Sequence, residues 1–228
     1  VLESLNLSVR RGDTPENVRE NWRRLGAAAG IDLTRAVYAK QVHSADVRIA
    51  HAADAQPPER EPRFTCDGFV TNEPGVALAV FMADCLPALL HDPAAGVIGA
   101  VHCGWRGSVA DILGAAVTQM CALGAHPADI RAAIGPGIGA CCFEVGPEVV
   151  AAAGALLGAP SGALVRPTAG DRALLDLKRV NALRLTQLGV PAEQIAVSDA
   201  CTMCRPDVFW SHRATDGHRG VQAAVITL

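Results

Sequence analysis

Two apolar runs within residues 76–107 end in reactive and polar side chains. Ala83-Asp84-Cys85 ends the first run, and His102-Cys103-Gly104-Trp105-Arg106-Gly107 ends the second. A thiolate and an imidazole are common ligands of zinc, and a neighbouring carboxylate can take part in acid–base chemistry. The candidate chemistry of the chain is therefore concentrated in this stretch.

The segments that carry these residues are predicted to form a β-hairpin. Residues 86–91 and 97–102 are short and apolar, and residues 92–96 have turn-forming types at both ends. Pairing of Cys85 with His102 would put both side chains on one face, with Cβ atoms roughly 5 Å apart. A one-residue slip would instead place Cys103 opposite Cys85, so the pattern leaves both registers open.

His43 is the third candidate ligand, because it lies at the end of a predicted strand rather than inside an apolar run. His43, Cys85 and His102 would give a metal ion three protein ligands and one open position, which is the pattern of catalytic zinc sites. The competing interpretation is that Cys85 is a buried apolar thiol and both histidines are hydrogen-bonded structural residues. Spacing alone does not separate the two.

Two charged residues are candidates for catalytic roles beside this group. Asp84 is the candidate general acid or base, or a residue that orients a ligand. Arg106 precedes a predicted helix over residues 108–123, whose amino-terminal amides favour anion binding near His102. Arg106 could therefore bind an anion, or it could serve only in packing or a surface ion pair.

The other cysteines have no evident partner in the sequence. Cys201 and Cys204 form a C-x-x-C pair, but the chain has no second such pair. Cys141 and Cys142 are adjacent, so in an extended segment at most one of them could face a site. We therefore interpret these four as structural or incidental thiols.

Composition narrows the class of protein. The chain has 228 residues, of which 50% are hydrophobic, and a net charge of -3, which fits one domain with a sizeable core. Because no basic run or long apolar stretch interrupts the chain, we expect neither a nucleic-acid partner nor a membrane partner. The eight irregularly spaced cysteines and the absence of signal-peptide character predict a soluble protein of the reducing cytoplasm.

Periodicity and turn residues predict the remaining elements. Helices are expected at 15–29, 108–123, 147–157 and 172–188; strands are expected at 36–42, 47–52, 69–71, 76–82, 86–91, 97–102, 195–198, 208–211 and 221–227. Residues 56–63 are predicted to be an exposed loop, and residues 134–140 a glycine-rich loop that approaches another segment closely.

Several motifs, in order, resemble the bacterial YfiH family, also known as the laccase-domain or polyphenol-oxidase family and related to human FAMIN. The motifs are Lys40-Gln41-Val42-His43-Ser44, Asp67-Gly68-Phe69-Val70-Thr71, Ala83-Asp84-Cys85-Leu86-Pro87, the His102–Gly107 segment, Ile134-Gly135-Pro136, Cys142-Phe143-Glu144-Val145-Gly146, Cys201-Thr202 and Phe209-Trp210-Ser211-His212-Arg213. The resemblance covers nearly the whole chain.

The resemblance implies an α+β fold, a mixed β-sandwich flanked by helices, as a single domain over residues 1–228. It implies zinc bound by His43, Cys85 and His102, with Asp84 and Arg106 beside it, and a nucleoside and phosphate as small-molecule partners. The implied activities are phosphorolysis of adenosine, inosine and methylthioadenosine, and adenosine deamination. The chain departs from the family near Ser4-Leu5-Asn6-Leu7, where an earlier strand with a Thr-Arg motif is expected, and at Phe143 and His212, which replace tyrosines.

Three alternatives follow from the same motifs. The older family name implies a copper-dependent polyphenol oxidase, but a multicopper site needs more imidazoles than this motif set supplies among seven histidines. A second is a peptidoglycan-editing enzyme or hydrolase that uses Cys85 and His102 as a dyad. The third is a non-catalytic module whose zinc is closed by a fourth ligand such as Cys103 or Cys142.

Overall fold

The computed structural model describes residues 5–158 and 162–228, so Ser4 of the amino-terminal departure lies outside the described residues. The helices are α1 (Pro15–Ala29), α2 (Trp105–Val109), α3 (Ile112–Ala122), α4 (Pro147–Leu157) and α5 (Leu177–Gln187). The strands are β1 (Ala39–Lys40), β2 (Val47–Ile49), β3 (Phe64–Thr65), β4 (Gly68–Thr71), β5 (Leu78–Met82), β6 (Leu86–Asp92), β7 (Val97–Cys103), β8 (Arg131–Ile134), β9 (Glu144–Val145), β10 (Val165–Pro167), β11 (Ala173–Leu175), β12 (Ile195–Val197) and β13 (Gln222–Ile226).

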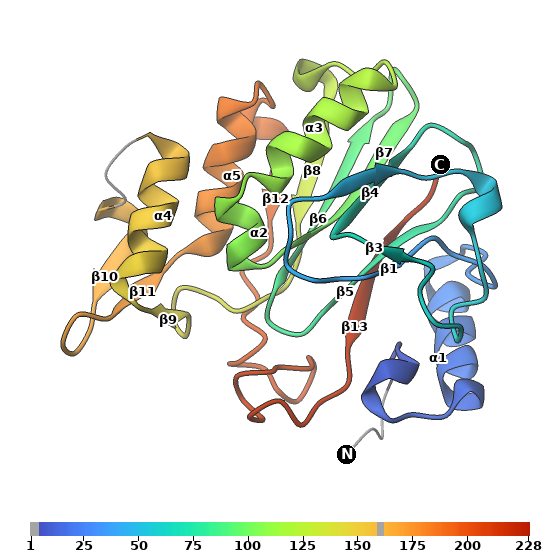
Figure 1. Cartoon of the computed structure of the whole chain (residues 1–228), viewed down its shortest axis with the longest axis horizontal. Helices are drawn as coiled ribbons and strands as arrows, with labels where there is room; N and C mark the ends of the chain where they lie inside the picture. The colour runs from blue at the N-terminus through green and yellow to red at the C-terminus, as the bar shows by residue number, and fades with distance from the viewer. Residues whose placement is uncertain (1–4, 159–161) are drawn as a thin grey trace.

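A six-stranded mixed sheet forms the middle layer, in the order β12-β8-β6-β7-β4-β2. Strands β6, β7 and β8 pair antiparallel, whereas β2 runs parallel to β4 and β12 runs parallel to β8. Helices α3 and α5 cover one face, and the antiparallel pair β5–β13, with α1 beyond it, covers the other (Figure 1). This confirms the expected mixed β-sandwich flanked by helices.

Successive side chains of β7 point alternately into two hydrophobic cores, one on each face of the sheet. Val97, Val101 and Cys103 point into the core beneath the helices, while Ile98 and Ala100 point into the core shared with β5. Both sets are almost fully buried, so the register of β7 is strongly determined. His102 belongs to the second set, and its side chain therefore points to the β5 side of the sheet.

Capping residues explain the helices that were predicted correctly. The Thr14 hydroxyl accepts a hydrogen bond from the Asn17 amide, Pro15 occupies the first turn, and Gly30 ends α1 in the left-handed region. Helix α4 also has the predicted bounds, between Gly146 and the left-handed Gly158.

Four predicted elements differ. The helix expected over 108–123 is divided, because Asp111 adopts φ 65° and caps α3 by accepting a hydrogen bond from the Gly114 amide. Residues 172–188 begin as strand β11, and only after Asp176, which caps α5, does the helix start. Residues 208–211 form turns rather than a strand, and the predicted exposed loop 56–63 includes buried Gln56.

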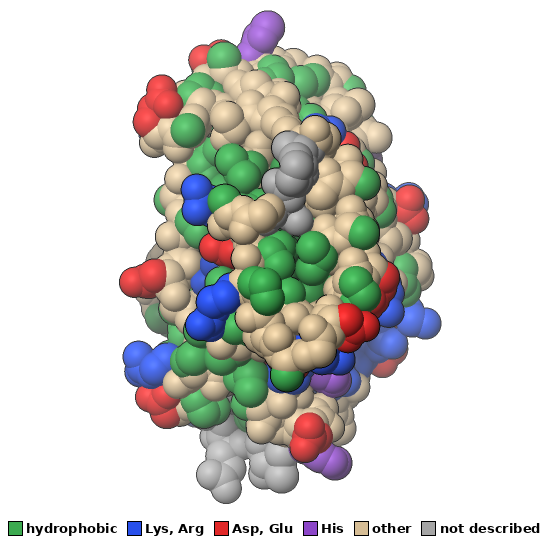
Figure 2. All heavy atoms as spheres, turned by 90° about the vertical axis from the view of Figure 1, so that its left-hand side faces the viewer, with side chains coloured by type: hydrophobic (Ala, Val, Ile, Leu, Met, Phe, Trp, Pro, Cys, Tyr) green, Lys and Arg blue, Asp and Glu red, His purple; other side chains and the backbone are tan. Residues whose placement is uncertain are grey.

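No helix in the described ranges is long and apolar enough to cross a membrane. Seen from the side of α4, apolar side chains gather in the middle of the surface, with charged side chains around them (Figure 2).

Candidate metal centre

The three predicted ligands converge from three separate segments. His43 follows β1, Cys85 immediately precedes β6, and His102 lies in β7. Their ligating atoms all lie within 4.8 Å of one another. Cys85 Sγ is 3.7 Å from His43 Nε2, and the two imidazole rings meet edge to face with centroids 5.0 Å apart. Two imidazoles and a thiol at these separations can bind one metal ion.

The hairpin register differs from the predicted one by two residues. Pro87 pairs with His102 and Leu86 with Cys103, so Cys85 is not directly opposite His102. The Asp92 carboxylate accepts hydrogen bonds from the Ala94 and Ala95 amides, which closes a four-residue loop after the last strand pair. A shift of two residues preserves the face, and Cys85 and His102 therefore still meet diagonally.

Asp67, whose role the sequence reasoning missed, fixes two of the three ligands. Its fully buried carboxylate accepts hydrogen bonds from the backbone amides of Val42, His43 and Ser44, from the Ser44 hydroxyl and from His102 Nδ1, at 2.8–3.1 Å. These contacts hold His43 at φ 64°, a conformation that side-chain-bearing residues adopt rarely. A single carboxylate therefore positions both histidines.

Electrostatics favour the ligating forms. Because Nδ1 of His102 donates to Asp67, its Nε2 is left to face the site. Burial opposes ionisation of Asp67, but the hydrogen bonds from His102 and Ser44 hold its pKa well below the usual range. Burial likewise opposes ionisation of Cys85, yet hydrogen bonds from His102 and His43 lower its pKa. The thiolate, which is the form that binds metals, is therefore favoured.

The proposed fourth ligands of a closed site point elsewhere. Cys103 packs in the core beneath the helices, where burial raises the pKa of its thiol. Cys142 belongs to a different group of side chains. Among the residues that the structure describes, this group thus has three donors, which fits a metal ion with an open coordination position.

A pocket of about 230 Å³ opens onto these ligands. Its walls come from the segment after residue 7, the loop 56–63, strand β5 and the chain before β13. The lining residues are Ser8, Val9, Arg10, Arg11, Tyr38, Ala39, Gln41, His43, Pro58, Arg60, Pro62, Phe81, Met82, Ala83, Cys85, His102, Arg219 and Val221. The pocket is therefore apolar along β5, and it is cationic along the segment after residue 7, which contributes Arg10 and Arg11.

Arg219 is the cationic residue whose environment most suggests a ligand. Its Nη1 donates to the Gly220 carbonyl at 3.2 Å, but its buried Nε has no hydrogen-bond partner among the described residues. Burial, followed by repulsion from Arg11, lowers its pKa to about 10. A half-buried guanidinium with a free donor beside the metal ligands is suited to an anionic group. No sequence motif indicated it, because it reaches the site only through the fold.

Asp84 and Arg106 lie outside the pocket lining. Thr202 Oγ1 and the Arg213 amide each donate to Asp84 at 2.6 Å, which occupies both carboxylate oxygens. Asp84 is buried and adopts φ 84°, so it shapes the backbone that presents Cys85. The Arg106 guanidinium is exposed and stacks over the Trp105 ring at 4.4 Å. Neither charged side chain is therefore among the residues that line the pocket.

Gly104 is required by the close approach of two ligands. A Cβ atom there would lie 2.8 Å from His43 Cδ2 and 3.2 Å from Cys85 Sγ, although the backbone itself has φ -67°. We expect Gly104→Ala to displace the ligands and to lower activity roughly 100-fold, as misplacements of about 1 Å do. Metal analysis and product assays check this, with Gly162→Ala as the control because no atom of the described residues lies within 4 Å of its Cβ position. Unchanged metal content in Gly104→Ala would contradict the tight packing.

This chain is similar to known proteins over nearly its whole length. The family model described as multi-copper polyphenol oxidoreductase laccase matches residues 1–228. "Purine nucleoside phosphorylase YlmD" of Geobacillus stearothermophilus is 38% identical over 98% of this chain and 83% of its own length. "Adenosine deaminase RL5", from an unknown prokaryotic organism, is 36% identical over 92% of this chain and 81% of its own length.

The structural comparison reaches the same result. The crystal structure of the Bacillus licheniformis hypothetical protein YfiH superimposes with a TM-score of 0.93 at 31% identity, covering 99% of this chain and 86% of that one. The match to the family model and the nearly full-length relatives show that this chain belongs to the YfiH, or laccase-domain, family of enzymes.

Proposed function

We propose that the protein is a zinc-dependent purine nucleoside phosphorylase that also deaminates adenosine. The proposal rests on the observation that the three candidate metal ligands and Arg219 line one pocket. Phosphorolysis needs both a bound phosphate and stabilisation of charge on the departing base. The names of the relatives support a purine nucleoside, such as adenosine, inosine or methylthioadenosine, as the substrate.

Each part of the pocket has a role in this proposal. His43, Cys85 and His102 hold the ion, and Asp67 keeps both imidazoles in position. Arg219 holds phosphate, while Phe81 of β5 packs against the purine. When bound, zinc supplies Lewis acidity and a water molecule of lowered pKa, which serves both purine reactions.

The donor set favours zinc over a multicopper centre. In the described part of the chain, the second group of side chains close enough to share a metal consists of four cysteines and contains no histidine. A trinuclear copper cluster requires several more imidazoles beside the first site. We therefore propose zinc despite the copper in the family name.

Phosphate dependence tests the reaction type. Adenosine incubated with phosphate should give adenine and ribose 1-phosphate, and omission of phosphate should stop adenine formation. Adenine release at the same rate without phosphate or arsenate would instead identify hydrolysis and would favour the Cys85–His102 hydrolase.

Arg219→Gln is expected to raise the phosphate concentration needed for half-maximal phosphorolysis by roughly 10- to 100-fold, because a charge-assisted contact is lost. Deamination, which uses no phosphate, should change far less. Arg106→Gln is the matched control, since its guanidinium lies outside the pocket lining. The measurement is the initial rate of each product over a range of phosphate concentrations. A larger effect at Arg106 than at Arg219 would reassign the anion site to the helix start.

The cytoplasmic location remains part of the proposal. It is supported by the eight cysteines, all of which lie in the described residues as free thiols.

A further inference from the structure

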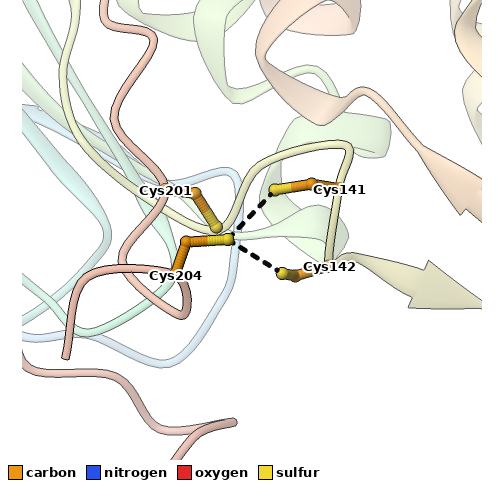
Figure 3. A group of neighbouring side chains, drawn as sticks. All are labelled: Cys141, Cys142, Cys201 and Cys204. Carbon is orange, nitrogen blue, oxygen red and sulfur yellow. Dashed lines mark hydrogen bonds between the residues drawn. The ribbon is translucent and has the colours of Figure 1, made fainter.

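Four cysteines outside the candidate metal centre lie together. Cys141 and Cys142 come from the loop between β8 and β9, and Cys201 and Cys204 come from the turns after β12. All four sulfur atoms lie within 4.8 Å of one another. Cys204 Sγ is 3.5 Å from Cys141 Sγ and 3.4 Å from Cys142 Sγ (Figure 3).

The prediction that Cys141 and Cys142 cannot share a site is wrong. The amides of Cys142 and Phe143 both donate to the Gly139 carbonyl at 2.9 Å, so this segment is a tight turn rather than an extended chain. Both thiols therefore point toward Cys204 (Figure 3). The adjacent pair supplies the partner that the C-x-x-C pair lacked in the sequence.

The spacing of the sulfur atoms is that of a metal site. Separations of 3.4–3.5 Å are far longer than the roughly 2.05 Å of a disulfide bond. They are close to the roughly 3.8 Å between thiolates that surround one ion at about 2.3 Å in a tetrahedron.

Neighbouring groups hold and stabilise the sulfur atoms. The Gly139 amide donates to Cys201 Sγ at 3.2 Å, which favours a thiolate. A Cβ atom at Gly139 would lie 3.2 Å from Cys201 Cβ and 3.3 Å from Cys141 Sγ, so glycine allows this approach. Lys178 Nζ donates to the Ser198 and Ala200 carbonyls at 2.7 Å and brings a positive charge to the loop that carries Cys201.

We propose that Cys141, Cys142, Cys201 and Cys204 bind a second zinc ion, in a structural role. Four protein ligands close the coordination sphere and leave no position for substrate. The same two loops also form hydrogen bonds to Asp84. The Ile138 amide donates to the Asp84 carbonyl, and Thr202 Oγ1 donates to the Asp84 carboxylate. By fixing these two loops, the second zinc stabilises the backbone conformation at Asp84, next to Cys85.

Metal stoichiometry tests this site separately from the first. Protein produced with added zinc and purified under reducing conditions should contain two zinc ions per chain. Cys204→Ser and Cys85→Ser should each contain one, and the double variant none. Cys121→Ser is the matched control, because Cys121 is an exposed thiol in α3 outside both groups, and it should retain two.

Cobalt substitution provides a spectroscopic readout that does not depend on activity and leaves all four cysteines of the cluster unchanged. Cobalt-loaded Cys85→Ser should retain the intense thiolate charge-transfer and visible bands of a tetrahedral four-thiolate site. Thermal unfolding of Cys204→Ser should occur at a lower temperature than that of Cys121→Ser.

Three results would overturn the proposal. One is a wild-type chain with a single zinc ion that Cys85→Ser removes. Another is iron in place of zinc in Cys85→Ser, and the third is a Cys141–Cys204 or Cys142–Cys204 disulfide in freshly purified protein.

Discussion

Asp67→Asn is expected to lower both metal affinity and stability, although no metal contact is removed. The amide of asparagine has one acceptor oxygen where the carboxylate has two, and its NH₂ group would face donors from Val42, His43, Ser44 or His102. Buried donors left unpaired cost about 1–3 kcal/mol each. We therefore expect a loss of roughly 3 kcal/mol of stability.

The metal affinity should fall by about 10- to 100-fold, as it does when residues that orient metal ligands are replaced. Competition with a chelator measures the affinity, and urea unfolding of the metal-free protein measures the stability.

Asp92→Asn is the matched control for this variant. Its carboxylate is also buried, and it accepts hydrogen bonds from the amides of Ala94, Ala95 and His126 at the other end of β6. It should lose stability and keep its metal affinity. Equal metal affinities for the two variants would show that Asp67 only stabilises the fold.

Local sequence signals were sufficient where a short segment determines the structure. Thr14, Pro15 and Gly30 specify both ends of α1 within 17 residues, and Gly146, Pro147 and Gly158 do the same for α4. The three candidate metal ligands could be predicted because reactive side chains at strand ends stand out from apolar runs.

Signals failed where long-range contacts decide the conformation. Leu174 pairs with Glu144 of β9, so residues 173–175 form a strand despite being predicted as the start of a helix. Asp111, which divides the predicted helix 108–123, also forms an ion pair with Arg184 of α5. Neither partner is visible from periodicity.

The same reason explains the missed site residues. Asp67 contacts His43 from 24 positions away, and Arg219 comes to the pocket from the far end of the chain. Cys141 and Cys142 lie about 60 positions before Cys204 in the sequence. Two adjacent residues of an extended chain could not both face one site, but the turn at Gly139 allows it. Residue types near strand ends predict which side chains are reactive, whereas the fold decides which of them lie together in one site.

His43→Ala is expected to have the largest effect on activity. The imidazole contributes one of three donors, so its loss should remove the ion and with it the support for both purine reactions. We expect adenine and inosine formation to fall together, by factors on the order of 1000. The fold should survive, because the His43 side chain is exposed and the backbone amide of this residue keeps its hydrogen bond to Asp67.

His51→Ala is the control for this variant, since His51 is a similarly exposed histidine that contacts Glu73 on the surface. Circular dichroism should show the same fold for both variants.

The most direct test of a single zinc site for both reactions is the rate of each product from adenosine and phosphate, compared among wild type, His43→Ala and His51→Ala. We predict that His43→Ala loses adenine and inosine formation to the same extent, while His51→Ala retains both at wild-type rates. Loss of one product with the other at its wild-type rate would contradict the account, because the surviving reaction would then not depend on the ion held by His43, Cys85 and His102.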